Sequence, residues 1–222
     1  MKIFLDTAIL DEIKAADAWG VLDGVTTNPS LAAQAGRNFK ENILAISALI
    51  GERAGTVSAE TVSLETDGMI EEARLVTSWA DNIVAKIPLT PNGLAAVSQL
   101  AKEGIRTNVT LVFSANQGLL AMKAGATYIS PFVGRIDDTG HDGMQLVRDL
   151  VEIKNYYGYE SEILAASLRH PLHVTDAALA GADIATLPFG VMKKMFGHPL
   201  TDSGLQRFLD DWATIDGSMR PF

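Results

Sequence analysis

The sequence contains no cysteine. Disulfides, thiolate nucleophiles, iron–sulfur clusters and cysteine-ligated zinc are therefore excluded, which fits a reducing compartment. The chain also lacks any run of about 18 apolar residues that could span a membrane. The apolar stretch at its start is interrupted at Asp6, so it is too short for a secretory signal. We therefore expect a soluble, cytoplasmic protein that does not contact a membrane.

Basic residues and glycine-rich phosphate motifs are also scarce. Lysine and arginine total 18 against 27 aspartates and glutamates, a net charge of −9, so a broad basic face for nucleic acid is not expected. There is no Gly-x-Gly dinucleotide fingerprint and no Gly-x4-Gly-Lys loop. His170 and His173 have helical spacing, but no carboxylate stands at a suitable nearby position to complete a metal site. The sequence therefore predicts neither a nucleotide cofactor nor a metal.

What the chain does contain is a regular alternation of strand-like and helical segments. Its 222 residues, 47% of them hydrophobic, are enough for one large core. Eight strand-like segments begin about 26 residues apart, close to the roughly 30 residues of one strand-helix unit. These segments are KIFLDT from Lys2, GVTTN from Gly24, TVSAETV from Thr56, NIVAKIP from Asn82, RTNVTLV from Arg106, TYISPFV from Thr127, EILAAS from Glu162 and DIATLP from Asp183.

This count favours an α/β fold with a closed (β/α)₈ barrel, a TIM barrel, over an open doubly wound sheet, which usually has fewer strands. No linker divides the chain, so residues 1–222 are expected to form a single domain. An additional C-terminal helix is predicted over residues 201–215. Its apolar stripe consists of Leu205, Phe208, Leu209 and Trp212. Because no strand follows, this helix either caps the barrel or packs on a neighbouring subunit.

Active sites of such barrels lie at the carboxyl ends of the strands. Seven successive strands carry polar side chains there or just beyond. They are Asp6, Thr26, Asn28, Glu60, Lys86, Asn108, Thr110, Ser130, Arg135, Ser167 and Arg169. We expect the candidate active site to be built from this set.

Lys86 is the strongest candidate for a catalytic residue, because it lies inside the apolar strand segment IVAKIP and shares a strand face with Val84. A lysine that points into a barrel is desolvated, and its neutral amine can attack a carbonyl to form a Schiff base. The other lysines stand at a strand start or in helical stretches. The alternative is a lysine that reaches past the strand end or only binds an anion.

Two carboxylates and two arginines complete the candidate chemistry. Asp6 and Glu60 lie late in apolar strands, where burial suits them to proton transfer; the alternative is an ion pair with a basic side chain. Arg135 and Arg169 follow adjacent strands and are candidates for one anion clamp. For Arg135 the alternative is a salt bridge with one of the aspartates at 137 and 138, whereas Arg169 has no acidic neighbour in the sequence.

Five strings stand in order along essentially the whole chain. They are DGVTTNPSL from Asp23, VAKIPLT from Val84, TNVTLVFSANQGLLA from Thr107, YISPFVGRIDD from Tyr128 and AASLRHP from Ala165. Together they resemble the short transaldolase family, which includes the closely related fructose-6-phosphate aldolases. The resemblance implies a class I aldolase-type barrel that needs no metal or cofactor. It also implies a homo-oligomer, a pentamer or decamer, in which the last helix packs on a neighbour.

The same resemblance implies roles for the candidates. Lys86 matches the Schiff-base lysine, and Asp6 matches the acid/base that assists carbon–carbon cleavage and formation. Glu60 and Thr110 match the pair that holds a water and relays protons. Asn28 and Asn108 match residues that bind hydroxyls of the dihydroxyacetone unit, and Ser130 matches a residue close to the imine. The phosphate site is matched by Arg135, Ser167 and Arg169, and Thr26 and Phe132 complete the expected substrate-binding set.

Two positions favour transfer of the three-carbon unit over its release. In the family's aldolase branch a glutamine stands in place of Glu60 and a tyrosine in place of Phe132. Phe132 cannot hydrogen-bond a water near the carbanion, so the enamine should survive to meet an acceptor aldehyde. The expected activity is that of a transaldolase of the pentose phosphate pathway. Two other functions stay open: a fructose-6-phosphate aldolase that releases dihydroxyacetone, and a noncatalytic phosphosugar-binding barrel.

Overall fold

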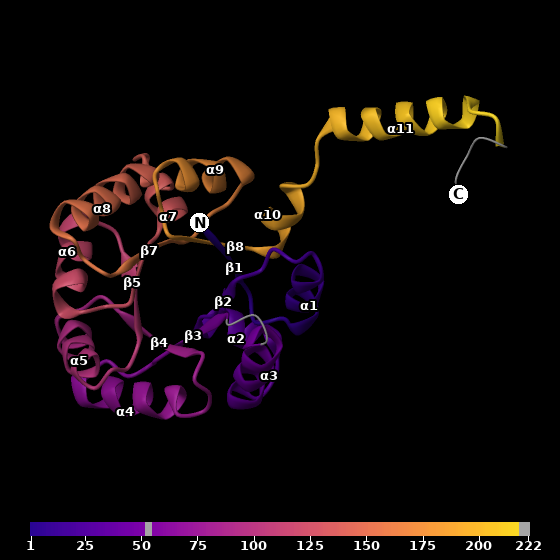
Figure 1. Ribbon diagram of the computed structural model, residues 1–222. Helices are drawn as coiled ribbons and strands as arrows, with labels where there is room; N and C mark the ends of the chain where they lie inside the picture. The colour runs from indigo at the N-terminus through magenta and orange to yellow at the C-terminus, as the bar shows by residue number, and fades with distance from the viewer. Residues whose placement is uncertain (52–54, 218–222) are drawn as a thin grey trace.

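Eight parallel strands close into a barrel in the order in which they occur along the chain (Figure 1). The computed structural model describes residues 1–51 and 55–217, so the expected domain of residues 1–222 includes two short stretches outside the described residues. The strands are β1 (Lys2–Asp6), β2 (Gly24–Thr26), β3 (Thr56–Glu60), β4 (Ile83–Pro88), β5 (Thr107–Val112), β6 (Tyr128–Pro131), β7 (Glu162–Ala165) and β8 (Ile184–Leu187). The prediction of a (β/α)₈ barrel is confirmed.

Helices form a ring outside the strands (Figure 1). The helices of this ring are α1 (Leu10–Ala18), α2 (Pro29–Ala35), α3 (Phe39–Gly51), α4 (Thr66–Thr77), α5 (Pro91–Lys102), α6 (Ala115–Ala124), α7 (Val133–Asp137), α8 (Gly143–Tyr157), α9 (Pro171–Leu179) and α10 (Phe189–Lys194). A further helix, α11 (Pro199–Thr214), follows them in the chain. Helix α5 begins at Pro91 and is capped by Thr90, whose hydroxyl accepts a hydrogen bond of 2.9 Å from the Gly93 amide. Short helices α2, α7 and α10 directly follow the ends of β2, β6 and β8.

The interior of the barrel is filled by a small apolar cluster that is separate from the core between strands and helices. It consists of Phe4, Val84, Tyr128, Leu164, Ala166 and Ile184, with Phe132 packed against it. Successive strand residues point to opposite faces, so Lys86, two positions after Val84, also points into the barrel. Gly24 makes room for the Phe4 ring, since a Cβ at that position would lie 2.6 Å from it.

The register of the strands aligns the candidate residues in neighbouring pairs. Glu60 on β3 stands beside Lys86 on β4, and Lys86 stands beside Asn108 on β5. On the two strands before β3, Asp6 on β1 stands beside Thr26 on β2. Side chains from strands far apart in the sequence thereby meet at one end of the barrel.

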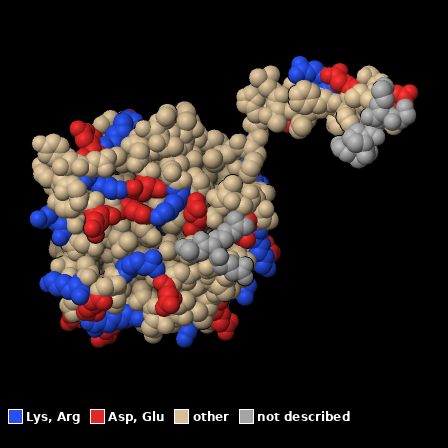
Figure 2. Space-filling model, viewed as in Figure 1, with Lys and Arg blue, Asp and Glu red and all other residues tan. Residues whose placement is uncertain are grey.

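Helix α11 leaves the barrel and extends away from it (Figure 1). None of its residues is buried. Much of its visible surface is uncharged, whereas charges of both signs are interspersed over the visible face of the barrel (Figure 2). No helix in the described part of the chain has both the length and the apolar character that crossing a membrane requires.

Candidate active site

Lys86 and Glu60 form a buried ion pair in the mouth of the barrel. The Lys86 ammonium lies 2.8 Å from Glu60 Oε2 and donates a hydrogen bond of 3.1 Å to the Thr27 carbonyl. Lys86 is only 5% exposed. The ion pair considered as the alternative for Glu60 is therefore present, and the same contact gives a path for a proton between the two groups. Removal of water makes this charge pair interact strongly.

Asp6 lies at the end of β1, separated from the Glu60 strand by β2, and is held by a hydroxyl. Thr26 Oγ1 donates a hydrogen bond of 2.7 Å to Asp6 Oδ1. The pKa of Asp6 is raised, mainly because burial disfavours the ionised carboxylate; the Thr26 hydrogen bond and the Lys86 charge oppose this shift, and the Glu60 charge adds to it. A carboxyl with a raised pKa binds a proton more readily than an ordinary aspartate, which suits it to proton transfer.

A threonine of the last strand extends this contact. Thr186 Oγ1 lies 2.7 Å from Thr26 Oγ1, and both residues are buried. Because Thr26 uses its hydroxyl proton on Asp6, Thr186 must be the donor in this second hydrogen bond. The sequence reasoning missed Thr186, although its position two residues after the inward-facing Ile184 could have indicated it.

Asn108 is fixed by two buried serines. Its Nδ2 donates to Ser58 Oγ at 3.1 Å, and its Oδ1 accepts from Ser130 Oγ at 2.7 Å. One amide proton of Asn108 remains for a substrate hydroxyl. Ser58, which sequence reasoning also missed, stands two positions before Glu60 and therefore on the same face of β3.

Thr110 has a buried hydroxyl with no hydrogen-bond partner among the described residues. An unpartnered buried polar group is costly, and a water or substrate atom would satisfy it. The next residue, Leu111, has a φ of +60°, and the β5–β6 pairing is irregular between Val109 and Val112. Such left-handed non-glycine residues concentrate at functional sites, because the surrounding structure has to hold them.

Asn28 has a double role at the end of β2. Its Oδ1 caps helix α2 by accepting a hydrogen bond of 2.9 Å from the Leu31 amide. The expected contact with a substrate hydroxyl can then use the NH₂ group as a donor or the second lone pair of Oδ1 as an acceptor.

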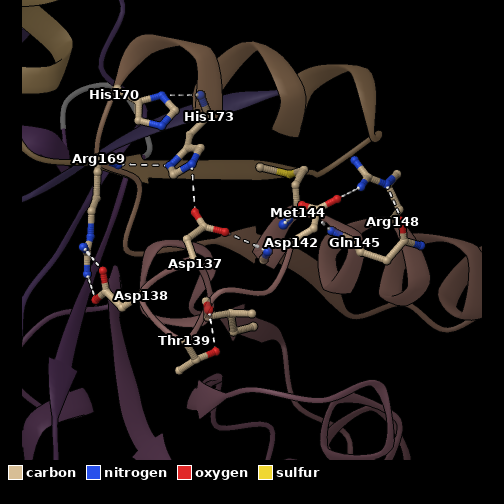
Figure 3. Close-up of polar contacts among 12 residues, drawn as sticks. Asp137, Asp138, Thr139, Asp142, Met144, Gln145, Arg148, Arg169, His170 and His173 are labelled. Atoms are coloured by element: carbon tan, nitrogen blue, oxygen red, sulfur yellow. Dashed lines mark hydrogen bonds and ion pairs between the residues drawn. The ribbon is translucent and has the colours of Figure 1, made fainter.

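Arg169 has no acidic neighbour in the sequence, but in the structure it pairs with Asp138, one of the two aspartates considered as alternative partners of Arg135. Arg169 Nη1 and Nη2 each donate to a different oxygen of Asp138 at 2.5 Å (Figure 3). Arg135 instead lies over the Phe132 ring, with its guanidinium carbon 5.4 Å from the ring centroid. The sequence did not reveal this pair, because Asp138 and Arg169 are far apart along the chain and come together only at the ends of adjacent strands.

His173 lies beside a carboxylate that comes from another part of the chain. His173 Nε2 lies 3.0 Å from Asp137 Oδ2 (Figure 3). The pKa of His173 is lowered, first by burial and then by His170, while the Asp137 charge opposes this shift. Within residues 1–51 and 55–217, no three His, Asp or Glu side chains are grouped so that they could hold a metal ion.

Ser167 and Arg135 are the other two residues expected to bind phosphate with Arg169. Ser167 has a φ of +59°, and its carbonyl accepts a hydrogen bond of 3.1 Å from the Gly134 amide, which fixes the β7 end against α7. Arg135 lines a groove of about 660 Å³ together with Phe113, Ser114, Thr139 and Gln145. This volume is in the range of small-molecule sites.

Fold and site together define a (β/α)₈-barrel protein with a lysine–carboxylate pair in its mouth and arginines beyond two strand ends. Residues 3–219 match the family described as transaldolase/fructose-6-phosphate aldolase. The chain therefore belongs to this transaldolase/fructose-6-phosphate aldolase family.

Similar proteins agree with this assignment. A probable transaldolase of Herpetosiphon aurantiacus is 55% identical over 222 residues, which is 100% of this chain and 99% of the relative. A probable transaldolase of Heliobacterium modesticaldum is 58% identical and covers 97% of this chain and 99% of its own. The solved structure of thiamine phosphate pyrophosphorylase from Pyrococcus furiosus superposes with a TM-score of 0.59 at 14% identity, over 87% of this chain and 93% of that one. That likeness concerns the fold alone.

Proposed function

We propose that this protein is a cytoplasmic transaldolase of the pentose phosphate pathway that works through a Schiff base on Lys86. It transfers a dihydroxyacetone unit from sedoheptulose 7-phosphate or fructose 6-phosphate to glyceraldehyde 3-phosphate or erythrose 4-phosphate. The observation that carries the proposal is the buried Lys86–Glu60 pair, whose N–O distance is 2.8 Å. Without a proton relay, a buried lysine would be a poor nucleophile, since only the neutral amine attacks a carbonyl.

In the first half-reaction, Lys86 Nζ transfers a proton to Glu60 and attacks the C2 carbonyl of the ketose phosphate. The resulting carbinolamine loses its oxygen as water, with Glu60 and a water on Thr110 relaying the protons, and an iminium ion remains. Asp6 then takes the proton of the C4 hydroxyl, the C3–C4 bond breaks, and its electron pair moves into the iminium ion. An aldose phosphate leaves, and the three-carbon unit stays on Lys86 as an enamine.

In the second half-reaction, the enamine carbon attacks the aldehyde of an acceptor, and Asp6 returns its proton to the new hydroxyl. Water then hydrolyses the iminium ion and restores the free lysine. The donor NH₂ group of Asn28 and the remaining amide proton of Asn108 are available for hydroxyls of the bound unit. Ser130, which is 1% exposed, lies next to Asn108 and is assigned to the imine end of the site. Ser167 and the two arginines are assigned to the phosphate.

The testing experiment is borohydride trapping with fructose 6-phosphate, followed by mass spectrometry of the modified peptide. A three-carbon adduct on Lys86, with turnover only when erythrose 4-phosphate is present, is the expected result. The same adduct with steady release of glyceraldehyde 3-phosphate in the absence of acceptor would identify the second candidate, a fructose-6-phosphate aldolase. Absence of any adduct would leave a phosphosugar-binding barrel and contradict the proposal.

Phe132 is expected to favour transfer over release. It packs against the inner cluster of the barrel, and its ring has no hydroxyl to orient a water. The substitution Phe132→Tyr should therefore raise the release of free dihydroxyacetone relative to transfer, measured as acceptor-free against acceptor-dependent turnover. Phe113→Tyr is the matched control. The Phe113 ring stands edge-on to the Phe132 ring, with 5.8 Å between the ring centroids, so this substitution adds the same hydroxyl to the neighbouring ring. An unchanged ratio in Phe132→Tyr would count against this account.

We also propose that α11 packs on a neighbouring subunit of a pentamer or decamer. Leu205, Phe208 and Leu209 are 58%, 62% and 64% exposed, and an apolar stripe of this kind marks an interaction surface. Truncation before Thr201 should give smaller species in light scattering. Gln206→Ala changes an α11 residue outside this stripe and should leave the mass of the oligomer equal to that of the wild-type protein. If the truncated protein still forms an oligomer with the same number of subunits, α11 does not hold the subunits together.

A further inference from the structure

Asp138 and Arg169 form a forked ion pair just outside the barrel mouth (Figure 3). Both terminal nitrogens of the guanidinium are engaged, each with its own carboxylate oxygen at 2.5 Å. A pair with two parallel hydrogen bonds fixes the plane of a guanidinium as well as its position. Asp138 therefore holds the side chain of Arg169 in one orientation.

The remainder of the Arg169 side chain lies against backbone. A Cβ on Gly134 would come within 2.6 Å of Arg169 Nε and 3.0 Å of its Cδ, so the arginine passes close over this glycine. Gly134 is in turn bonded through its amide to the Ser167 carbonyl at 3.1 Å. The stem of Arg169 is thus confined by the same contact that joins α7 to the end of β7.

Asp138 itself is held by its surroundings. Its amide donates to the Gly134 carbonyl at 3.2 Å. The preceding residue, Asp137, accepts a hydrogen bond of 2.8 Å from the Gly143 amide at the start of α8 and contacts His173 on α9 at 3.0 Å. The backbone that carries Asp138 is therefore tied to the two helices that follow it.

The two arginines act on one carboxylate. The pKa of Asp138 is lowered, first by the hydrogen bond from Arg169 and further by the charges of Arg169 and Arg135. Both guanidinium groups therefore lie within electrostatic reach of the same point. Arg135 makes no ion pair within the parts of the chain that the structure describes, so its charge remains available to an anion.

From this geometry we infer that Asp138 is a positioning residue for the phosphate of the substrate, acting through Arg169. A guanidinium has five N–H donors, and the fork with Asp138 uses two of them, so Arg169 can still donate to a phosphate. Arg169 is half exposed, and a free long side chain would have to be ordered when the phosphate binds. Asp138 imposes this order beforehand. The inference rests on the proposed function, because it concerns phosphorylated sugars.

The test compares Asp138→Asn with the wild-type enzyme, using glyceraldehyde 3-phosphate and unphosphorylated glyceraldehyde as acceptors and fructose 6-phosphate as donor. The KM for glyceraldehyde 3-phosphate should rise about three- to tenfold relative to that for glyceraldehyde, which matches the cost of ordering one long side chain. The matched control is Glu103→Gln, which breaks a similar surface fork, with Arg74, at 2.7 and 2.9 Å on the α4–α5 side. This control should leave the ratio of the two KM values unchanged.

A double-mutant cycle shows whether Asp138 acts through Arg169. In an Arg169→Gln background, Asp138→Asn should have no further effect on the KM for glyceraldehyde 3-phosphate. A lower KM of Asp138→Asn for glyceraldehyde 3-phosphate would mean that Asp138 competes with the phosphate for Arg169. An equal rise of KM for both acceptors would mean a general structural defect. Either result overturns the inference. If the wild-type enzyme forms no adduct on Lys86, the proposed function fails instead, so the two failures are distinguishable.

Discussion

Replacement of Lys86 with methionine is expected to abolish the borohydride adduct and to reduce transfer by at least about 10⁴-fold, since methionine cannot form an imine. The loss should appear in kcat, because the covalent intermediate is removed while the remaining sugar contacts stay in place. Turnover with fructose 6-phosphate and erythrose 4-phosphate measures the effect. Lys102→Met, on the last turn of α5, is the matched control and should stay active. Retained adduct formation in Lys86→Met would show that another amine is the nucleophile.

The same substitution should also destabilise the fold. It leaves Glu60, whose side chain is only 14% exposed, without its charged partner. Removal of one member of a buried pair costs about 3–5 kcal/mol. The double substitution Lys86→Met with Glu60→Gln removes the uncompensated charge and should recover much of the free energy of unfolding, measured by denaturant titration. No recovery would mean that the Lys86 stem, rather than its charge, stabilises the mouth.

Replacement of Asp6 with asparagine is expected to lower kcat about 10²- to 10⁴-fold, the range for loss of a general acid/base. Lys86 keeps its amine in this variant, so an adduct on Lys86 should still form with fructose 6-phosphate before cleavage. Single-turnover release of glyceraldehyde 3-phosphate measures the loss. Asp11→Asn is the control, since the Asp11 side chain is 93% exposed on α1. Cleavage at an unchanged rate in Asp6→Asn would remove Asp6 from the mechanism.

Asp6→Asn should also stabilise the protein, and more so at higher pH. Burial raises the pKa of Asp6 in the folded state above its value of 3.8 in the unfolded chain, so the folded state holds the proton more tightly. The stability associated with this group is complete below the unfolded pKa and is lost as pH rises through the raised folded pKa. The Tm difference between variant and wild type should therefore grow as the pH rises above the unfolded pKa of 3.8. A Tm difference that stays constant or shrinks as the pH rises would contradict the raised pKa of Asp6 and its burial as the cause.

The positions of the candidate side chains could be anticipated where they depend on a single strand. Residues of one strand alternate between faces, so Val84 and Lys86 had to share a side, and the carboxyl end of each strand could be read from the sequence order. Contacts between strands depend on register, which one sequence does not reveal. The pairing of Glu60 with Lys86 at 2.8 Å and the contact of Thr186 with Thr26 at 2.7 Å are of this kind.

The sequence by itself determined the eight-strand barrel, the polar residues at the strand ends and the apolar stripe of the last helix, because these follow from local periodicity and from order along the chain. Only the tertiary structure decided which groups are partners. Asp138 is three positions from Arg135 but pairs with Arg169, 31 positions away. The physical reason is that the position of a loop side chain depends on how the ends of neighbouring strands are arranged in the barrel. Proximity along the sequence therefore does not predict proximity in space.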